Sequence, residues 1–138
     1  MSRLRGRALH PGDWVVDASV AIQWYVPDGQ EDAATRLLAP GLGLHVPELF
    51  FAEVVRIVRK KACLLKAPEL TVAEGREVLR RLIDLPLIAH PLGTLAEAAY
   101  ELSASIAGLG AYDACYVALA VRLGTAVITA DRKLVAAT

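Results

Sequence analysis

The sequence predicts an α/β fold, in which a central, mainly parallel sheet lies between layers of helices. Short apolar runs alternate with longer helical segments, a pattern typical of right-handed βαβ units. The first run, Trp14 to Val16, is apolar on both sides, as a central parallel strand should be. A length of 138 residues and a hydrophobic content of 55% indicate one domain with a sizeable core.

The N-terminal half begins with a strand at 14–17, which leads into a short helix over 19–25 that a proline ends. A second helix is expected over 30–38, where alanine and leucine side chains share one face. A brief strand at 44–46 closes at Pro47.

The middle of the chain predicts a long helix over 48–65, whose C-terminal half is rich in Arg and Lys, the charge that the helix dipole favours there. The next helix, over 71–84, begins with Thr71 and has Glu74 three residues later, which is the signature of a capping box. A third strand at 87–90 ends before a proline.

The same capping spacing, Thr94 with Glu97, predicts the start of a helix over 94–107. An apolar helix over 111–123 follows and ends at Gly124.

The last predicted elements are a strand at 125–129 and a helical turn at 132–136. We interpret the basic segment 1–12 as a flexible lead-in and 13–138 as a single domain.

Composition restricts the classes of partner. Lys plus Arg equal Asp plus Glu at 15 each, so a polyanion would have to be held by a local patch or a metal ion. The two cysteines have neither metal-site nor disulfide spacing. No apolar run approaches the ~20 residues of a membrane helix, and the basic N-terminus lacks the apolar core of a signal peptide. We therefore expect a cytoplasmic protein without a membrane partner.

Acidic residues are predicted to meet at one edge of the sheet. Asp17 and Asp131 follow strands, and the carboxyl ends of parallel strands form the edge where ligands bind. Asp113 lies in the first turn of its helix and Glu53 in the second turn of the long helix, and both helices begin at that edge. The acids can therefore converge without unusual geometry.

Carboxylates that are crowded together need a cation. Glu53 has apolar neighbours, and an ionised carboxylate among apolar side chains is costly unless it is paired. Like charges also raise one another's pKa, and no Lys or Arg lies within four residues of Asp17. Mg²⁺ or Mn²⁺ suits a set of carboxylate and water ligands.

Structural alternatives remain for each acid except Glu53. Asp17 and Asp131 are each placed to cap a helix, and Asp113 suits the positive end of one. The hydroxyls of Ser19 and Thr129 either orient a carboxylate or serve in capping and in the strand ladder. The histidines are interpreted as non-ligands. The aromatic residues are interpreted as core residues rather than as platforms that stack on bases, namely Trp14, Trp24, Tyr100, Tyr112 and Tyr116.

Four sequence blocks resemble the PIN-domain ribonucleases, specifically the VapC-type toxins of toxin–antitoxin pairs. The blocks are VVDAS at 15–19, PELFFAEV at 47–54, AYDACYVALA at 111–120 and LGTAVITADRKL at 123–134. Their order and spacing cover nearly the whole chain.

The resemblance implies a PIN-like three-layer α/β/α sandwich and an endonuclease that cuts RNA with Mg²⁺ or Mn²⁺. It also implies a homodimer that a cognate antitoxin silences. The acidic cluster of the family maps onto Asp17, Glu53, Asp113 and Asp131, with Asp17 and Asp113 as metal ligands and Glu53 and Asp131 acting directly or through water. Its supporting hydroxyls map onto Ser19 and Thr129.

Three departures from the family pattern are visible. Arg56 stands where many relatives have Asn, and Gly110 stands where many have Ser or Thr. Relatives also run on into a final strand, which is expected to be missing here. The RNA-binding residues stay open: the basic C-terminal half of the long helix either contacts the RNA backbone or is simply solvated.

Two other functions are consistent with a fold of this class. The first is a non-catalytic PIN-like interaction module, which would keep the fold but would not need the acids. The presence of all four acids argues against it. A phospho-acceptor receiver domain requires paired acids beside the end of its first strand, whereas Asp13 lies four residues before Asp17 and at the other end of the strand.

Overall fold

The computed structural model describes residues 12–26 and 43–130, within which four short strands form one sheet. The strands are β1 (Asp13–Val16), β2 (Gly43–Pro47), β3 (Ile88–His90) and β4 (Val127–Ile128). Their order is β3-β2-β1-β4, and every neighbouring pair is parallel. The strand predicted to be central, β1, does lie between two others. The helix expected over 30–38 and the turn expected over 132–136 lie outside the described residues.

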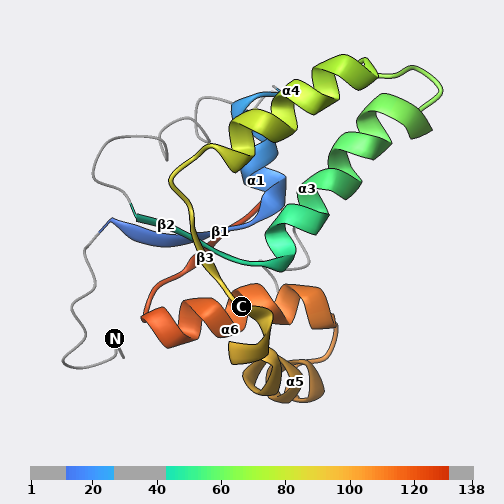
Figure 1. The fold of residues 1–138 in the computed structure, drawn as a ribbon. Helices are drawn as coiled ribbons and strands as arrows, with labels where there is room; N and C mark the ends of the chain where they lie inside the picture. Colours follow the sequence, from blue (N-terminus) through green and yellow to red (C-terminus); the bar gives the residue numbers. More distant parts are fainter. Residues whose placement is uncertain (1–11, 27–42, 131–138) are drawn as a thin grey trace.

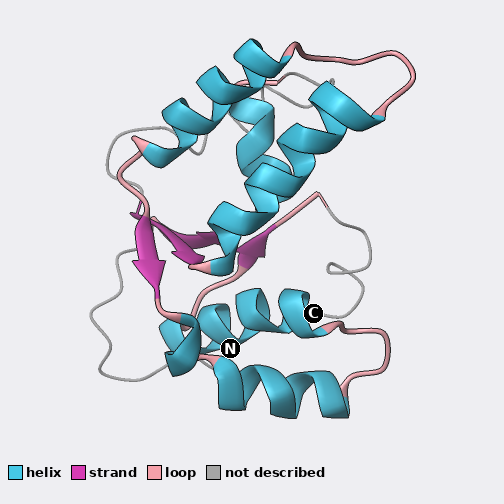
Figure 2. Cartoon of the chain, turned by 45° about the vertical axis from the view of Figure 1, so that its right-hand side comes forward, coloured by secondary structure: helices cyan, strands magenta, loops and turns pink. Residues whose placement is uncertain are grey.

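Helices cover both faces of this sheet, as predicted. One layer contains α1 (Ala18–Ala21), α3 (Leu49–Arg59) and α4 (Val72–Ile83), and the other contains α5 (Ala96–Ser105) and α6 (Ala111–Leu123). Figure 1 shows the two layers on opposite sides of the strands, and the turned view in Figure 2 shows the same separation. The fold is therefore a three-layer α/β/α sandwich.

Neighbouring residues of β1 belong to two different cores. Val16 packs in one cluster with Phe50 and Val54 of α3, whereas Val15 packs in the other with Tyr116 of α6. Successive side chains of a strand point to opposite faces, so both layers are anchored on the same strand. Val15 and Val16 are each 0% exposed, which confirms the prediction of an apolar strand buried on both faces.

The long helix expected over 48–65 is divided in two. Its regular part is α3, and it continues as one wider π-helical turn, η3 (Lys60–Leu64). The capping box predicted for α4 is confirmed, because Thr71 Oγ1 accepts a 3.0 Å hydrogen bond from the Glu74 N–H and Glu74 Oε1 accepts one of 2.8 Å from the Thr71 N–H.

The second predicted cap, at Thr94, is wrong. Thr94 is the last residue of a 3₁₀ turn, η4 (Leu92–Thr94), and its hydroxyl donates to the carbonyl of Pro91 at 2.7 Å. The helix α5 begins after Leu95, which occupies the cap position without a side-chain cap. Leu95 is 0% exposed. Because this side chain is buried at the cap position, Leu95 rather than Thr94 precedes the first residue of α5.

The remaining elements follow the predictions closely. The short helix after β1 consists of α1 and a 3₁₀ turn, η1 (Ile22–Trp24). The helix α6 ends as expected at Gly124, whose φ of 68° lies in the left-handed region that glycine adopts without strain. Within the described part of the chain, no helix has the length and apolar character needed to cross a membrane.

Candidate active site

Asp17 lies directly after β1, at the carboxyl edge of the sheet, and is only 6% exposed. It occupies the cap position of α1, but its side chain makes no capping hydrogen bond. Instead, Asp17 Oδ2 accepts hydrogen bonds from the hydroxyls of Ser19, at 2.9 Å, and Thr129, at 2.7 Å. The capping alternative for Asp17 is therefore wrong, and the predicted orienting role of the two hydroxyls matches this geometry.

Ser19 and Thr129 also join the first and last strands of the described sheet. Ser19 Oγ accepts a 3.1 Å hydrogen bond from the backbone N–H of Ala130, two residues beyond β4. The backbone N–H of Asp17 donates to the carbonyl of Ile128 at 3.0 Å. Because these contacts use Oδ2, no hydrogen bond within the described residues occupies Asp17 Oδ1, and this oxygen can serve as a ligand.

Glu53 enters the site from α3 and is half-buried. Burial raises the pKa of its carboxyl above the usual value, the Tyr116 hydrogen bond lowers it, and the negative charges of Asp17 and Asp113 raise it further. Glu53 therefore lies close enough to Asp17 and to Asp113 for their charges to interact with its own. The prediction that Glu53 is a costly acid in an apolar wall agrees with this electrostatic environment.

Asp113 reaches the site from the first turn of α6. It lines the same cavity as Glu53, a space of about 340 Å³ between α3 and the start of α6. The other lining residues are Arg56, Gly110, Ala111 and Tyr112. The lining therefore combines two carboxylates with one cation and one aromatic ring.

The predicted cluster is brought together only in part by the described residues. Asp17 is linked to its two hydroxyls, and Glu53 and Asp113 share one cavity, whereas Asp131 lies outside the described residues. Within residues 12–26 and 43–130, no three His, Cys, Asp or Glu side chains are close enough to enclose a metal ion by themselves. Mg²⁺ suits such an arrangement, because it usually keeps several waters and takes one or two carboxylates together with substrate oxygens.

The sequence interpretation missed the role of Tyr116. This residue was expected only in the core and is indeed 0% exposed, but its hydroxyl also donates a 2.6 Å hydrogen bond to Glu53 Oε1. A signal was present, since Tyr116 follows Asp113 by three residues and so shares its helix face. For Tyr100 and Tyr112 the core interpretation is wrong, because these side chains are 73% and 71% exposed.

The histidines contact each other rather than the acids of the site. His45 Nδ1 on β2 lies 3.0 Å from His90 Nε2 on β3. Asp13 Oδ1 lies 3.9 Å from His45 Nε2. Asp13 begins β1, so it lies at the other end of the strand from Asp17, and a receiver-type pair of acids does not form.

Comparison with known proteins identifies the class to which this fold and site belong. The sequence profile of the PIN domain matches residues 14–138. A solved structure of VapC20 from Mycobacterium tuberculosis, described as a toxin that cleaves the sarcin–ricin loop, superposes with a TM-score of 0.67 over 89% of this chain and 93% of that one. Its sequence identity is 17%, so this likeness supports the fold alone. The chain belongs to the PIN-domain family.

The sequence relatives narrow the class. Ribonuclease VapC9 of Mycobacterium tuberculosis is 38% identical over 120 residues, which cover 87% of each chain. Ribonuclease VapC3 of Pyrobaculum aerophilum is 32% identical over 122 residues, covering 87% of this chain and 90% of the relative. Within the PIN-domain family, the chain is a member of the VapC ribonucleases, as the four sequence blocks indicate.

Proposed function

We propose that the chain is a metal-dependent endoribonuclease that hydrolyses RNA phosphodiester bonds and acts as the toxin of a toxin–antitoxin pair. The observation that carries the proposal is that Glu53 and Asp113 line one cavity. Burial raises the pKa of Glu53 there, and the charges of Asp17 and Asp113 raise it further. Crowded carboxylates oppose one another unless a cation is present, and membership of a ribonuclease family supplies the reaction.

The donor set fits Mg²⁺ or Mn²⁺, because it consists of carboxylate oxygens without soft or nitrogen ligands. Asp17 and Asp113 would hold the ion, with Glu53 and Asp131 acting directly or through water. When bound, the ion supplies positive charge to an attacking water and to the scissile phosphate.

The other side chains position these carboxylates. Ser19 and Thr129 hold Asp17 Oδ2 and so orient Oδ1. Tyr116 holds Glu53 Oε1 from the opposite layer of helices. Each hydrogen bond restricts the rotation of a carboxylate, which reduces the ordering needed when substrate and ion arrive.

The proposed partners are RNA, a cognate antitoxin protein and a second copy of the chain. Several large apolar side chains are exposed, which supports further association. They include Val55, Leu64, Val72, Ile83, Tyr100, Tyr112 and Val121, each more than half exposed. Light scattering at micromolar concentration should give the mass of a homodimer, and the mass of a monomer would overturn that part of the proposal.

Cleavage of an end-labelled single-stranded RNA tests the activity. The wild type should cut with Mg²⁺ or Mn²⁺ and lose its activity in excess chelator. Asp17→Asn and Asp113→Asn should each lower the rate by about 100-fold or more, because each removes charge from the reacting centre. Glu97→Gln, which neutralises an exposed acid on α5, is the matched control and should cut normally. Undiminished cleavage in chelator would overturn the metal mechanism.

A further inference from the structure

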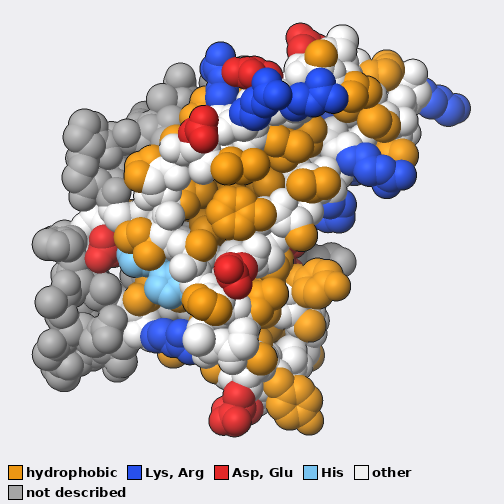
Figure 3. Space-filling model, in the orientation of Figure 1, with side chains coloured by type: hydrophobic (Ala, Val, Ile, Leu, Met, Phe, Trp, Pro, Cys, Tyr) orange, Lys and Arg blue, Asp and Glu red, His pale blue; other side chains and the backbone are white. Residues whose placement is uncertain are grey.

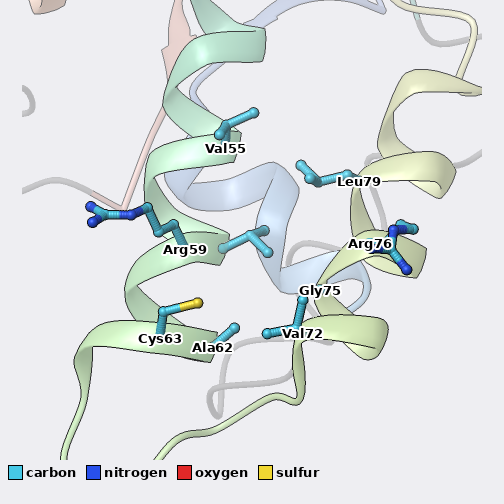
Figure 4. Close-up of a pocket in the computed structure, with 9 residues that line it drawn as sticks. Val55, Arg59, Ala62, Cys63, Val72, Gly75, Arg76 and Leu79 are labelled. Carbon is cyan, nitrogen blue, oxygen red and sulfur yellow. The ribbon is translucent and has the colours of Figure 1, made fainter.

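The basic residues in the C-terminal half of α3 and in η3 have different surroundings. Figure 3 shows that most Lys and Arg side chains on the visible face lie over α3 and α4. Arg59 lines a separate cavity of about 240 Å³ between these helices, where Figure 4 shows it with Cys63 and, across from them, Val72 of α4. Lys61 pairs with Glu69 at 3.3 Å. Arg56 alone, among the described cations, lines the acidic cavity.

Arg56 follows Glu53 by three residues, which places both on one face of α3. Its side chain is exposed, and within the described part of the chain no hydrogen bond or ion pair engages the guanidinium. The charge of Arg56 lowers the pKa of Glu53, but burial of Glu53 raises it by more. Because Arg56 is exposed at the cavity, its donors are available to another anion.

Tyr112 supplies a second, different surface in the same cavity. It precedes Asp113 at the start of α6, and the residue is 71% exposed. Because Tyr112 is exposed, its ring contributes little apolar burial to the stability of the fold. Such a ring is a suitable platform for a nucleobase, because stacking on an aromatic side chain is favourable for every base.

We propose, on the basis of the proposed function, that this cavity is a subsite for single-stranded RNA beside the scissile bond. The Arg56 guanidinium binds a backbone phosphate, and the Tyr112 ring stacks on an adjacent base. A planar guanidinium matches the oxygens of a phosphate in a bidentate manner. The positive charge of Arg56 also offsets the repulsion between the carboxylates and the RNA backbone. The net charge of the chain is zero and cannot offset this repulsion.

Binding measurements test the subsite without requiring cleavage. A short fluorescent single-stranded RNA is titrated with the protein in chelator, at several salt concentrations. Arg56→Ala should weaken binding and reduce the slope of log affinity against log salt by about 0.7, the value for one phosphate contact on a single strand. Arg56→Lys should retain part of that slope. Arg59→Ala, one turn further along α3, is the matched control and should bind like the wild type.

The aromatic part has its own controls. Tyr112→Ala should weaken RNA binding by about 10-fold, within the range of base stacking, whereas Tyr112→Phe should bind normally. Tyr100→Ala removes an equally exposed ring from α5, away from the cavity lining, and should have no effect. If Tyr112→Ala and Tyr100→Ala bind alike, the stacking role is overturned.

Kinetics separate substrate binding from a purely electrostatic role of Arg56. In the subsite, Arg56→Ala raises KM more than it lowers kcat. If Arg56 were only a counter-ion of Glu53, the variant would shift the pH profile of kcat and bind RNA normally, and that result would overturn the inference.

The inference and the proposed function can fail separately. RNA binding that depends on Arg56 and Tyr112, in a protein that never cuts RNA with Mg²⁺ or Mn²⁺, would leave the subsite standing and overturn the ribonuclease proposal. Normal cleavage and binding by both alanine variants would overturn the subsite alone. A wild-type protein that binds no RNA overturns the subsite as well.

Discussion

The hydroxyl of Tyr116 donates a 2.6 Å hydrogen bond to Oε1 of Glu53, and this contact joins α6 to α3 across the candidate site. The tyrosine is fully buried, and burial together with the charge of Glu53 raises the pKa of its phenol above the usual value. The phenol therefore stays protonated and remains a donor at every pH at which the protein functions. Glu53, in contrast, is held where burial makes its negative charge unfavourable. Such an environment is expected of a carboxylate that binds a cation.

Glu53→Gln should stabilise the metal-free protein at pH 7.5, because the amide keeps an oxygen that accepts from Tyr116 and removes a buried charge. The pKa of Glu53 is raised in the folded state, so the folded protein binds its proton more readily than the unfolded chain does. Stability from this group is complete below about pH 4.5 and is lost as the pH rises through the raised pKa. Thermal melts in chelator should show the advantage of the variant shrinking toward pH 4.5.

The same variant should cut RNA at least about 100-fold more slowly, because it lacks the carboxylate. Tyr116→Phe is its control: the carboxylate remains but loses its donor, which should destabilise the protein by roughly 0.5–1.5 kcal/mol. A Glu53→Gln protein that melts below the wild type at pH 7.5 would contradict the interpretation of Glu53 as an electrostatically strained acid.

Mn²⁺ should raise the melting temperature of the wild type by mass action. At a hundred times the dissociation constant, the gain in the free energy of unfolding is about 2.7 kcal/mol. Asp113→Asn removes one proposed ligand and should gain much less under the same conditions. Glu97→Gln, as the charge-matched control, should respond like the wild type. Equal melting temperatures of the wild type with Mn²⁺ and with chelator would argue against a metal site formed by these residues.

The histidine pair predicts that stability falls in mild acid. Burial lowers the pKa of both rings, the charge of Asp13 opposes this at His45, and the charges of His45 and Arg122 lower the pKa of His90 further. The unfolded chain therefore binds these protons more readily than the folded one. Stability from the pair is complete above about pH 6.5 and is lost as the pH falls through the lowered pKa values.

A structural reason supports the same direction. The ring nitrogens lie 3.0 Å apart, so one must donate and the other must accept, and protonation of both rings turns the acceptor into a second donor. His90→Gln should reduce the slope of the unfolding free energy between pH 7 and pH 5 by up to about 1.4 kcal/mol per pH unit. Urea unfolding at a series of pH values measures this slope, and an unchanged slope would show that His90 does not bind a proton on unfolding.

Serine at Gly110 should stabilise the protein, whereas serine at Gly108 should destabilise it. Gly110 occupies the cap position of α6 with a φ of −73°, and it provides no side-chain cap. Gly110→Ser adds a cap and restricts the unfolded chain, for a gain of about 0.5–1 kcal/mol. Gly108 has a φ of 85°, where a side chain costs about 1 kcal/mol.

The two positions form a matched pair, because a Cβ atom at either one meets nothing within 4 Å. Only the backbone conformation and the cap therefore differ between them. Thermal melts should move in opposite directions, by roughly 2–4 °C per kcal/mol. A decrease at both positions would indicate that the start of α6 does not need a cap.

The sequence by itself determined that Asp17 lies at the carboxyl edge of the sheet. An apolar strand that ends in Asp17, and helices that follow strands, place acids at one edge through local patterns alone. The sequence also predicted the capping box of Thr71 and Glu74 and the end of α6 at Gly124. Both were predictable because each depends on residues within one helical turn.

Only the tertiary structure decided how those acids are held and which neighbours they have. Thr129 meets Asp17 across 112 residues, and Tyr116 meets Glu53 across 63. The different surroundings of Arg56 and Arg59 depend on where α6 begins and on how α4 packs against α3. The true start of α5 depends on the burial of Leu95. Such contacts depend on the packing of whole elements, and local periodicity specifies which face of a helix is apolar but not what lies opposite it.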